Sequence, residues 1–376
     1  MPKVLEVLRS FGLLGFTAFG GPTAHLGYFR TEFVERKKWL DDKQYSEIVA
    51  ISQLLPGPGS SQVGMALGYQ RAGFAGMTAA WFAFTLPSVV LMTAFALLFD
   101  ATDAGWTLGL LAAAVAVVFH AVSGMARSMA ATPLTATIAV ASGIAVLALP
   151  SAFTHLGMIL AAGLVGIFAF KTLVDETPPA APLRAIPAWA GIGSLILFFI
   201  GLVAAIIGGG FYPAFYQAGA TVFGGGHVVL PLLEKLVVAP GWIANNDFLA
   251  GYSAAQAVPG PMFTFASYLG AVHGGIAGAL IATVAIFIPG TLLTIAGLYF
   301  WGRWREAPLL QAAIKGINAG VVGLLGAALY DPVFTHGING VASLSIAAVC
   351  WLGLAKWKIP PWAIALGAAL AGWVLL

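Results

Sequence analysis

A long internal repeat is the feature that most limits the fold of this chain. Residues 15–22 read GFTAFGGP and residues 219–226 read GATVFGGG, while residues 53–58 read QLLPGP and residues 256–261 read QAVPGP. The offset between matching residues stays between 202 and 204, so the two halves align with almost no gaps. Because Gly and Pro break both copies at the same places, we expect two related units with matching interruptions.

Composition predicts that both units lie in a membrane. Hydrophobic residues make up 60% of the 376 and charged residues only 8%, whereas a soluble domain has about 25% charged residues. Two related, interrupted hydrophobic halves are typical of transporters. The sequence therefore predicts an all-α polytopic membrane protein surrounded by the lipid bilayer. Stretches long enough to cross it include residues 74–99, 107–126, 152–170, 189–208, 276–300 and 336–355.

The charges and the single cysteine exclude several classes of function. The net charge of +3 sits in short loops, so no nucleic-acid partner is expected. Cys350 is the only cysteine, which rules out a disulfide within the chain and a thiolate metal site. The sequence has no His-Glu-x-x-His zinc motif, no evident nucleophile with a base and no phosphate-binding Gly-x-x-x-x-Gly-Lys loop. We therefore expect neither an enzyme nor an ATP-driven pump, and no cofactor or metal.

The chain is predicted to have three parts. An N-terminal transport repeat covers residues 1–172, and a C-terminal transport repeat covers residues 207–376. Between them, residues 173–206 form a Pro-rich loop, centred on residues 175–182, and one linker transmembrane span. The linker span, residues 189–208, has no partner in the repeat.

Loop charges predict that the two halves have opposite orientations. Residues 30–43 contain five Lys or Arg residues, but the matching residues 235–248 contain only Lys235. In the next loop the bias reverses. The second half has Arg303 and Arg305 there, whereas the matching loop of the first half has Asp100 and Asp103 and no Lys or Arg. Since Lys and Arg accumulate on the cytoplasmic side, this pattern indicates an inverted-topology repeat with broken or re-entrant helices, and the extra span reverses the second half.

Two numbers of crossings agree with this pattern. If residues 5–36 with 45–70, and residues 208–234 with 250–272, dip into the membrane and return, about nine segments cross it. The alternative is about thirteen full crossings. Parity of the loop charges favours the smaller number.

The Gly and Pro breaks are the predicted substrate site. A broken helix exposes a new N-terminus, whose free N–H groups and partial positive charge attract anions. Gln53 and Gln256 precede the two Pro-Gly-Pro loops, and each amide can either hold an oxyanion without a fixed charge or satisfy the carbonyls that the prolines leave free. Ser60, or its neighbour Ser61, and Thr264 can cap the following helices or donate hydroxyls to a ligand.

Charged residues near the breaks are few. Arg30 and Arg71 are candidates to bind an oxyanion, because a guanidinium donates two hydrogen bonds at once. His25, Glu32 and Glu47 qualify by position for proton coupling, although for each of them an interfacial, solvated or ion-paired position is the favoured interpretation. The residues expected to bind substrate are Gly20, Gly21, Thr23, Arg30, Gln53, Gly57, Gly59, Ser60, Arg71, Gly224, Gly225, His227, Gln256, Gly260 and Thr264.

The motifs at residues 15–22 and 53–58, with Trp39 between them, resemble those of the chromate ion transporter (CHR) family in its long form of two fused halves. The resemblance covers nearly the whole chain. It implies a multi-pass protein of the bacterial or archaeal inner (plasma) membrane that exports chromate, confers chromate resistance and lets sulfate compete. The second half departs from the motif at Gly226 and Met262, which argues against two equivalent anion sites.

The expected function is therefore secondary active export of chromate, a sulfate-like tetrahedral dianion, driven by the membrane potential or the proton motive force. The alternative is a transporter or channel of the same architecture for sulfate or another oxyanion. A homodimer is compatible with the sequence.

Overall fold

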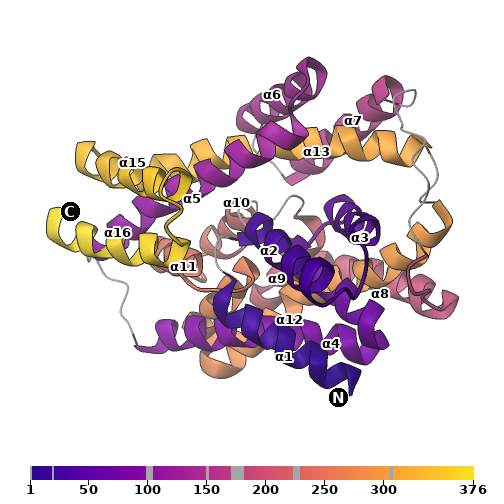
Figure 1. Cartoon of the computed structure of the whole chain (residues 1–376). Helices are drawn as coiled ribbons and strands as arrows, with labels where there is room; N and C mark the ends of the chain where they lie inside the picture. The colour runs from indigo at the N-terminus through magenta and orange to yellow at the C-terminus, as the bar shows by residue number, and fades with distance from the viewer. Residues whose placement is uncertain are drawn as a thin grey trace.

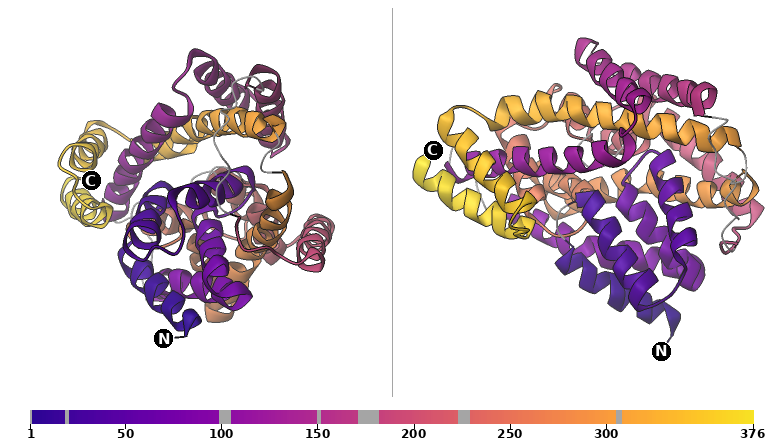
Figure 2. Two further views of the ribbon diagram at one scale, coloured as in Figure 1. Left: turned by 45° about the vertical axis from the view of Figure 1, so that its right-hand side comes forward. Right: turned by 45° about the horizontal axis from the view of Figure 1, so that its top comes forward.

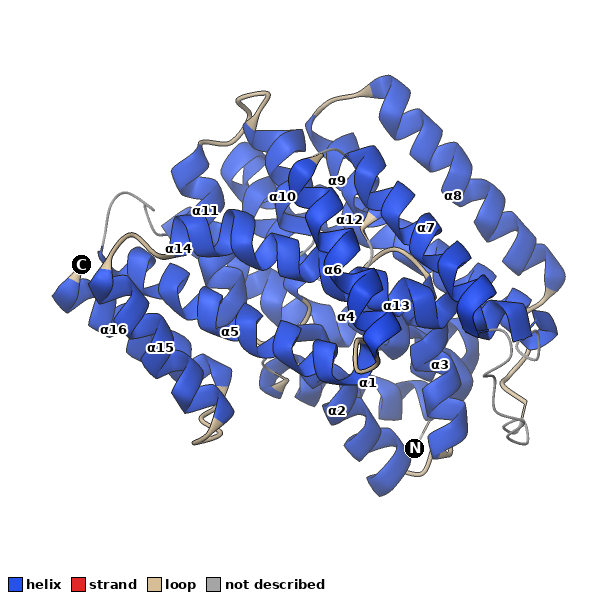
Figure 3. Ribbon diagram, turned by 90° about the horizontal axis from the view of Figure 1, so that it is seen from above, coloured by secondary structure: helices blue, strands red, loops and turns tan. Residues whose placement is uncertain are grey.

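The computed structural model describes residues 2–18, 21–98, 105–149, 152–170, 182–222, 229–304 and 308–376. All regular structure within these ranges is helical, as Figure 3 shows. This confirms the prediction of an all-α protein.

The first half contains seven α-helices and one π-helical segment. Local signals fix several starts: Asp41 caps α3 through a capping box with Gln44, and Thr132 caps α6 ahead of Pro133. The elements are α1 (Lys3–Thr17), α2 (Gly21–Phe29), η1 (Arg30–Arg36), α3 (Asp42–Leu54), α4 (Gly59–Leu98), α5 (Gly105–Met129), α6 (Pro133–Ala148) and α7 (Ala152–Phe170).

The second half repeats this order after the linker helix α8 (Ala188–Gly208). The Pro-rich loop predicted around residues 175–182 lies outside the described residues except for Pro182, which begins a non-helical segment. The elements are α9 (Phe211–Thr221), α10 (Val229–Leu233), η2 (Glu234–Val238), α11 (Asn245–Ala257), η3 (Met262–Thr264), α12 (Phe265–Trp304), α13 (Pro308–Ala328), η4 (Leu329–Phe334), α14 (Thr335–Gly337), α15 (Val341–Ala355) and α16 (Pro361–Leu375).

Four of the predicted stretches, 74–99, 107–126, 189–208 and 276–300, coincide with candidate membrane spans, whereas 152–170 and 336–355 fall in the shorter apolar helices α7 and α15. Within the described residues, five helices are long and apolar enough to cross a membrane. Four shorter apolar helices, α6, the later part of α7, α15 and the later part of α16, accompany them. The five candidate spans are residues 59–98, 108–127, 188–208, 262–301 and 311–331.

The two longest helices, α4 and α12, each fold back on themselves. Ala72 and Gly73 leave the helical conformation, and Gly73 has a φ of +67°, which a glycine adopts readily. In a straight helix Gly68 and Gly76 would lie about 12 Å apart, yet a Cβ on Gly68 would overlap the carbonyl oxygen of Gly76. Gly275 makes the same turn in α12, with a φ of +61°.

Each of these hairpins therefore has a short arm and a long arm. The short arms are residues 59–71 and 262–273, and the long arms are residues 74–98 and 276–304. A short arm of this length covers about 20 Å, less than the hydrocarbon thickness of a bilayer.

The helices form two groups (Figure 1). The inner group consists of α1 to α4 with α8 to α12, and the two hairpins pack against each other at its centre. The outer group consists of α5, α6, α7, α13, α15 and α16. Two further views show the same separation (Figure 2). The groups touch mainly where α11 meets α5 and α16, and where α3 meets α13.

In the outer group, helices of each half pack mainly on helices of the other half. The first half's α5 packs on α15 and α16 of the second half, and the second half's α13 packs on α6 and α7 of the first. Small residues permit these contacts: a Cβ on Gly109 would overlap the carbonyl of Ala368, and one on Gly316 would overlap that of Ala162. The exchange is reciprocal, as a two-fold relation between the halves requires.

The linker helix α8 lies at the outer edge of the inner group (Figure 3). It packs on α9 and α12 only along one side. The other side exposes large apolar residues, including Ile196, Ile200 and Ile207. A helix with such a face is suited to contact with lipid.

Candidate functional site

The two Pro-Gly-Pro loops each bond to the opposite half of the chain. The backbone N–H of Gly57 donates to the carbonyl of Val222 at 2.6 Å, and the N–H of Gly260 donates to the carbonyl of Ala18 at 2.9 Å. Ala18 and Val222 are the C-cap residues that directly follow α1 and α9. Each loop is therefore tied to the helix break of the other half, and we call the region of these four residues the crossing.

Both loops also press on the long arm of the opposite hairpin. Gly57 has a φ of +121° and Gly260 a φ of +90°, conformations that L side chains rarely adopt. A Cβ on Gly57 would lie 3.2 Å from the Cα of Gly290. A Cβ on Gly260 would overlap the Oγ of Ser88, and that hydroxyl donates to the carbonyl of Pro259. Glycine is thus required twice over, by conformation and by close approach.

His25 is the titratable candidate that the structure brings to the crossing. Its side chain is fully buried, with the ring 5.2 Å from that of Phe84. Its Nε2 lies 3.1 Å from the carbonyl oxygen of Ala18, which can only accept, so Nε2 carries a proton. Its Nδ1 lies 3.1 Å from the Oγ of Ser60. The carbonyl of Ala18 therefore receives hydrogen bonds from both halves.

The hydroxyls that follow the two loops differ in their bonding. Ser60 is bound to His25, whereas the Oγ of its neighbour Ser61 is buried with no hydrogen-bond partner among the described residues. In the second half, the Oγ1 of Thr264 donates to the carbonyl of Pro261 at 2.7 Å. Gln62 closes the first loop, because its Nε2 donates to the carbonyls of Pro56, at 2.9 Å, and Gly290, at 3.4 Å.

For some of the predicted site residues the structure describes only the backbone, and others lie outside the described residues. Gly21 begins α2 with a φ of +75°, and Gly59 begins α4. The predicted site residues Gly20, Gly224, Gly225 and His227 lie outside the described residues. The side chains of Thr23, Gln53 and Gln256 also lie outside the described part, although their helices α2, α3 and α11 lead into or out of the breaks.

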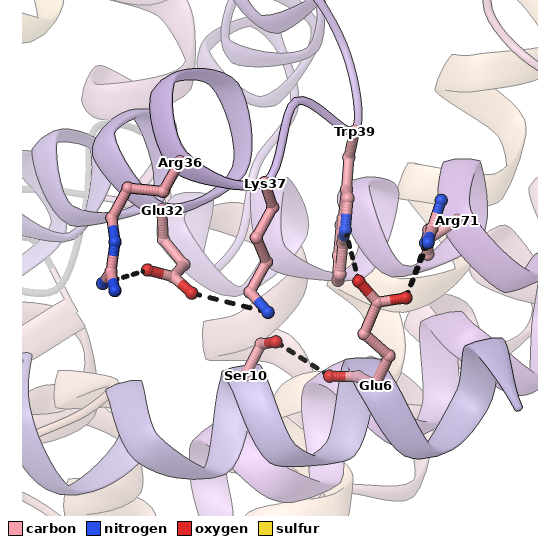
Figure 4. A network of polar contacts seen from close by, with 7 residues as sticks. All are labelled: Glu6, Ser10, Glu32, Arg36, Lys37, Trp39 and Arg71. Atoms are coloured by element: carbon pink, nitrogen blue, oxygen red, sulfur yellow. Dashed lines mark hydrogen bonds and ion pairs between the residues drawn. The ribbon is translucent and has the colours of Figure 1, made fainter. Parts of the chain in front are cut away.

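Arg71 lies at the far end of the short arm from the crossing (Figure 4). Its Nη2 donates to the carboxylate of Glu6 at 2.6 Å, and its guanidinium lies over the ring of Trp39 at 5.4 Å. The indole of Trp39 donates to the same carboxylate at 2.9 Å. This arrangement joins α1, the segment after η1 and α4 at one end of the inner group.

Replacing Arg71 by glutamine is expected to lower stability rather than change ligand affinity. Both charged side chains are partly exposed, at 32% for Arg71 and 24% for Glu6, so solvent screens the pair. We expect a loss of about 1 kcal/mol, measured as a lower midpoint of thermal unfolding in detergent. Arg9→Gln, at an exposed position on α1, is the matched control. A large loss of oxyanion affinity with an unchanged midpoint would place Arg71 in the site instead.

Arg30 and Glu32 lie in the first turn of η1, and both are held in ion pairs. The Nε of Arg30 donates to Asp42 at 2.8 Å, and Nη1 pairs with Glu35. The hydrogen bond that Arg30 donates to the carboxylate of Asp42 raises the pKa of the Arg30 guanidinium above its ordinary value. Glu32 accepts from Arg36 at 2.8 Å (Figure 4). Neither Arg30 nor Glu32 contacts the described residues of the crossing.

Glu32 lines a cavity, and Glu47 contacts the second half of the chain. Glu32 and Arg36 line a cavity of about 570 Å³ between α1 and the segment α2–η1. Glu47, on α3, accepts a hydrogen bond of 3.2 Å from the indole of Trp301 on α12, so it joins the two halves. Among the described residues, no group of three or more His, Cys, Asp or Glu side chains could hold a metal ion.

Sequence reasoning missed residues on the long arm of α4. Ser88 binds the carbonyl of the opposite loop, while Trp81 and Thr85 lie on the same helix face at a spacing of four and three residues. The signal was present: these polar side chains recur at helical spacing within an otherwise apolar stretch.

Apolar helices of membrane-spanning length, arranged around a buried crossing of two broken halves, define the class of polytopic membrane transporters. The chain belongs to the chromate transporter family: the family model described as "Chromate transporter" matches residues 5–167 and residues 209–373.

Known relatives agree with this assignment. The chain is 29% identical to a chromate transport protein of Pseudomonas aeruginosa, over 100% of this chain and 92% of the relative. It is 27% identical to a probable chromate transport protein of Synechococcus elongatus, over 98% of this chain and 94% of the relative. An uncharacterized transporter of Bacillus subtilis is 30% identical over 44% of this chain and 95% of its own length. No solved structure matches the chain.

Proposed function

We propose that this chain is a secondary active transporter that exports chromate from the cytoplasm, and that the dianion binds at the crossing. The printed names of the relatives in Pseudomonas aeruginosa and Synechococcus elongatus support chromate as the substrate. The observation that carries the location of the site is the pair of backbone hydrogen bonds from Gly57 to Val222 and from Gly260 to Ala18. They hold breaks from both halves at one place inside the inner group.

Two properties of the crossing suit a tetrahedral dianion. Helix α4 begins there at Gly59, so its free N–H groups and partial positive charge point toward the loop. The unpartnered, buried hydroxyl of Ser61 lies in the first turn of the same helix. A buried donor without a partner costs about 1–3 kcal/mol, which an oxyanion would recover by accepting from it.

We also propose that the halves are inverted with respect to each other and that about nine segments cross the membrane. The loop charges and the reciprocal packing of α5 and α13 support a two-fold relation. The short arms of α4 and α12, each about 20 Å long, do not cover the hydrocarbon thickness of a bilayer, which supports segments that dip in and return.

Movement of the inner group against the outer group would open the crossing to either side. The groups are joined mainly through α11 and α3, while each is closely packed internally. A membrane potential that is negative inside favours exit of a dianion by about 2.3 kcal/mol per charge for each 100 mV. Export can therefore run on the potential, in a bacterial or archaeal inner membrane, without an obligatory proton partner.

Radiolabelled chromate flux in inside-out vesicles tests the proposal. With an imposed potential, positive in the lumen, and no pH gradient, we expect chromate to accumulate and excess sulfate to inhibit it. Protein-free vesicles are the control. Flux that appears only with a pH gradient would contradict the potential-driven mechanism and favour proton coupling through His25, which lies at the crossing. Flux that neither gradient concentrates would indicate a channel.

A further inference from the structure

Three buried donors without partners lie on α4 beside the crossing. They are the Oγ of Ser61, the Nε1 of Trp81 and the Oγ1 of Thr85. Ser61 and Thr85 are each 2% exposed. Hydroxyls in apolar helices usually bond to a carbonyl one turn earlier, as Thr78 and Thr283 do. Thr85 has no such bond among the described residues, so its buried hydroxyl is free to donate to a ligand.

The hairpin brings these donors to one level. Its turn lies at Ala72 and Gly73, and its arms are antiparallel, so Ser61 on the short arm and Thr85 on the long arm are nearly equally far from the turn. Trp81 is one helical turn from Thr85 on the same face. The opposite loop lies at this level too, because a Cβ on Gly260 would be 3.2 Å from the carbonyl oxygen of Phe84.

The face that carries Trp81 and Thr85 is turned toward the second half. The ring of Trp81 lies 5.8 Å from that of Phe287 on α12, in an edge-to-face arrangement. Ser88, on the same face as Thr85, donates to the carbonyl of Pro259. The open donors therefore lie where the two hairpins and the second Pro-Gly-Pro loop meet.

The matching positions of the second half offer no such donors. Thr264 matches Ser61 and donates to Pro261, while Thr283 matches Trp81 and donates to Ala279 at 2.7 Å. Phe287 matches Thr85 and has no polar atom on its side chain. The crossing is thus symmetric in its backbone and asymmetric in its side chains.

We propose that Ser61, Trp81 and Thr85 donate hydrogen bonds to the oxyanion, so that a single binding site is built from neutral donors of the first half. The proposal rests on the proposed function and assigns its side-chain ligands. An indole N–H can only donate, and hydroxyls can donate without carrying a charge. The site therefore binds the dianion through hydrogen bonds and not through an ion pair with a cationic side chain. Retention without an ion pair is weak, which favours release on the far side of the membrane.

Isothermal titration of the full-length protein in detergent with sodium sulfate, and separately with sodium chromate, tests this assignment. The variants Ser61→Ala and Thr85→Val each remove one donor with little change of shape, and Trp81→Phe removes the indole N–H together with part of the ring. Since a hydrogen bond to a charged group contributes about 1.5–3 kcal/mol, each variant is expected to weaken binding at least about tenfold. Thr283→Val, the symmetry match of Trp81, should bind as tightly as the unmodified protein.

The outcomes separate this inference from the proposed function. If the unmodified protein binds oxyanion and the three variants bind it equally well, the assignment of donors is wrong while the site at the crossing stands. If the unmodified protein binds neither anion, the proposed function fails together with the inference. Size-exclusion profiles and unfolding midpoints identify any variant that does not fold, and the Thr85→Val variant, nearly isosteric with the original, then decides.

Discussion

The Gly260→Val variant is expected to reach the membrane in normal amount and to show no transport above background. Gly260 has a φ of +90°, where a β-branched residue is strained by about 1–3 kcal/mol. Its Cβ would also overlap the hydroxyl of Ser88 and crowd the carbonyl of Phe84. The loop would have to leave α4, which breaks the hydrogen bond to Ala18 and opens the proposed site. Chromate flux in vesicles measures the effect.

The matched control for this substitution is Gly193→Val on the linker helix α8. A Cβ on Gly193 would meet nothing within 4 Å, so valine is expected to leave flux near normal. Gly57→Val, with a φ of +121° in the first loop, should behave like Gly260→Val. Normal transport by both loop variants would show that the crossing is not the path of the anion.

A second large effect is expected from closing the space within a hairpin. Gly68→Leu would force a side chain into the carbonyl of Gly76, and Gly270→Leu would do the same against Gly278. Because backbone lies on the opposing side, relief requires the two arms to separate, at a cost we place at about 3 kcal/mol or more. We expect both variants to lose the folded, monodisperse peak in size-exclusion chromatography.

Gly367→Leu on α16 serves as the control, since a Cβ there would meet nothing within 4 Å. If Gly68→Leu folded as well as this control, α4 would be a straight helix rather than a hairpin. That result would remove the geometric basis for placing Ser61 and Thr85 at the same level.

Much of this architecture could be predicted from the sequence, because the repeat marks the places where backbone regularity fails. The breaks at residues 15–22 and 219–226 and the two Pro-Gly-Pro loops were visible as Gly and Pro in apolar surroundings. The structure confirms that α1 and α9 end there, and it adds a contact that was not predicted: each Pro-Gly-Pro loop bonds to the helix break of the other half.

The side chains of the site were harder to predict. Arg71 was favoured for its chemistry, but its partner Glu6 lies on another helix, and no local pattern shows that the two will pair. Thr85 looked like an ordinary hydroxyl in an apolar helix. Its open hydrogen bond became evident only when the hairpin, the second loop and α12 were placed around it.

The sequence prediction separated the dipping segments 45–70 and 250–272 from the spans 74–99 and 276–300, and the turns of α4 and α12 lie at these divisions, but the close packing of the two arms was not predicted. Gly73 and Gly275 occupy matching positions of the repeat, but a single glycine in an apolar run is equally compatible with a kink. A full reversal of the helix is shown by two close glycine pairs, Gly68 with Gly76 and Gly270 with Gly278. Glycine at both positions of a pair permits the two backbones to approach so closely.

The most direct test of the central claim is a structure of the detergent-solubilised protein soaked with tungstate, a tetrahedral dianion that scatters strongly. We predict one peak at the crossing, in contact with the first turn of α4 and within hydrogen-bonding distance of Ser61 and Thr85. Tungstate bound only near Arg30 and Arg36, with the crossing empty at saturating concentration, would contradict the account.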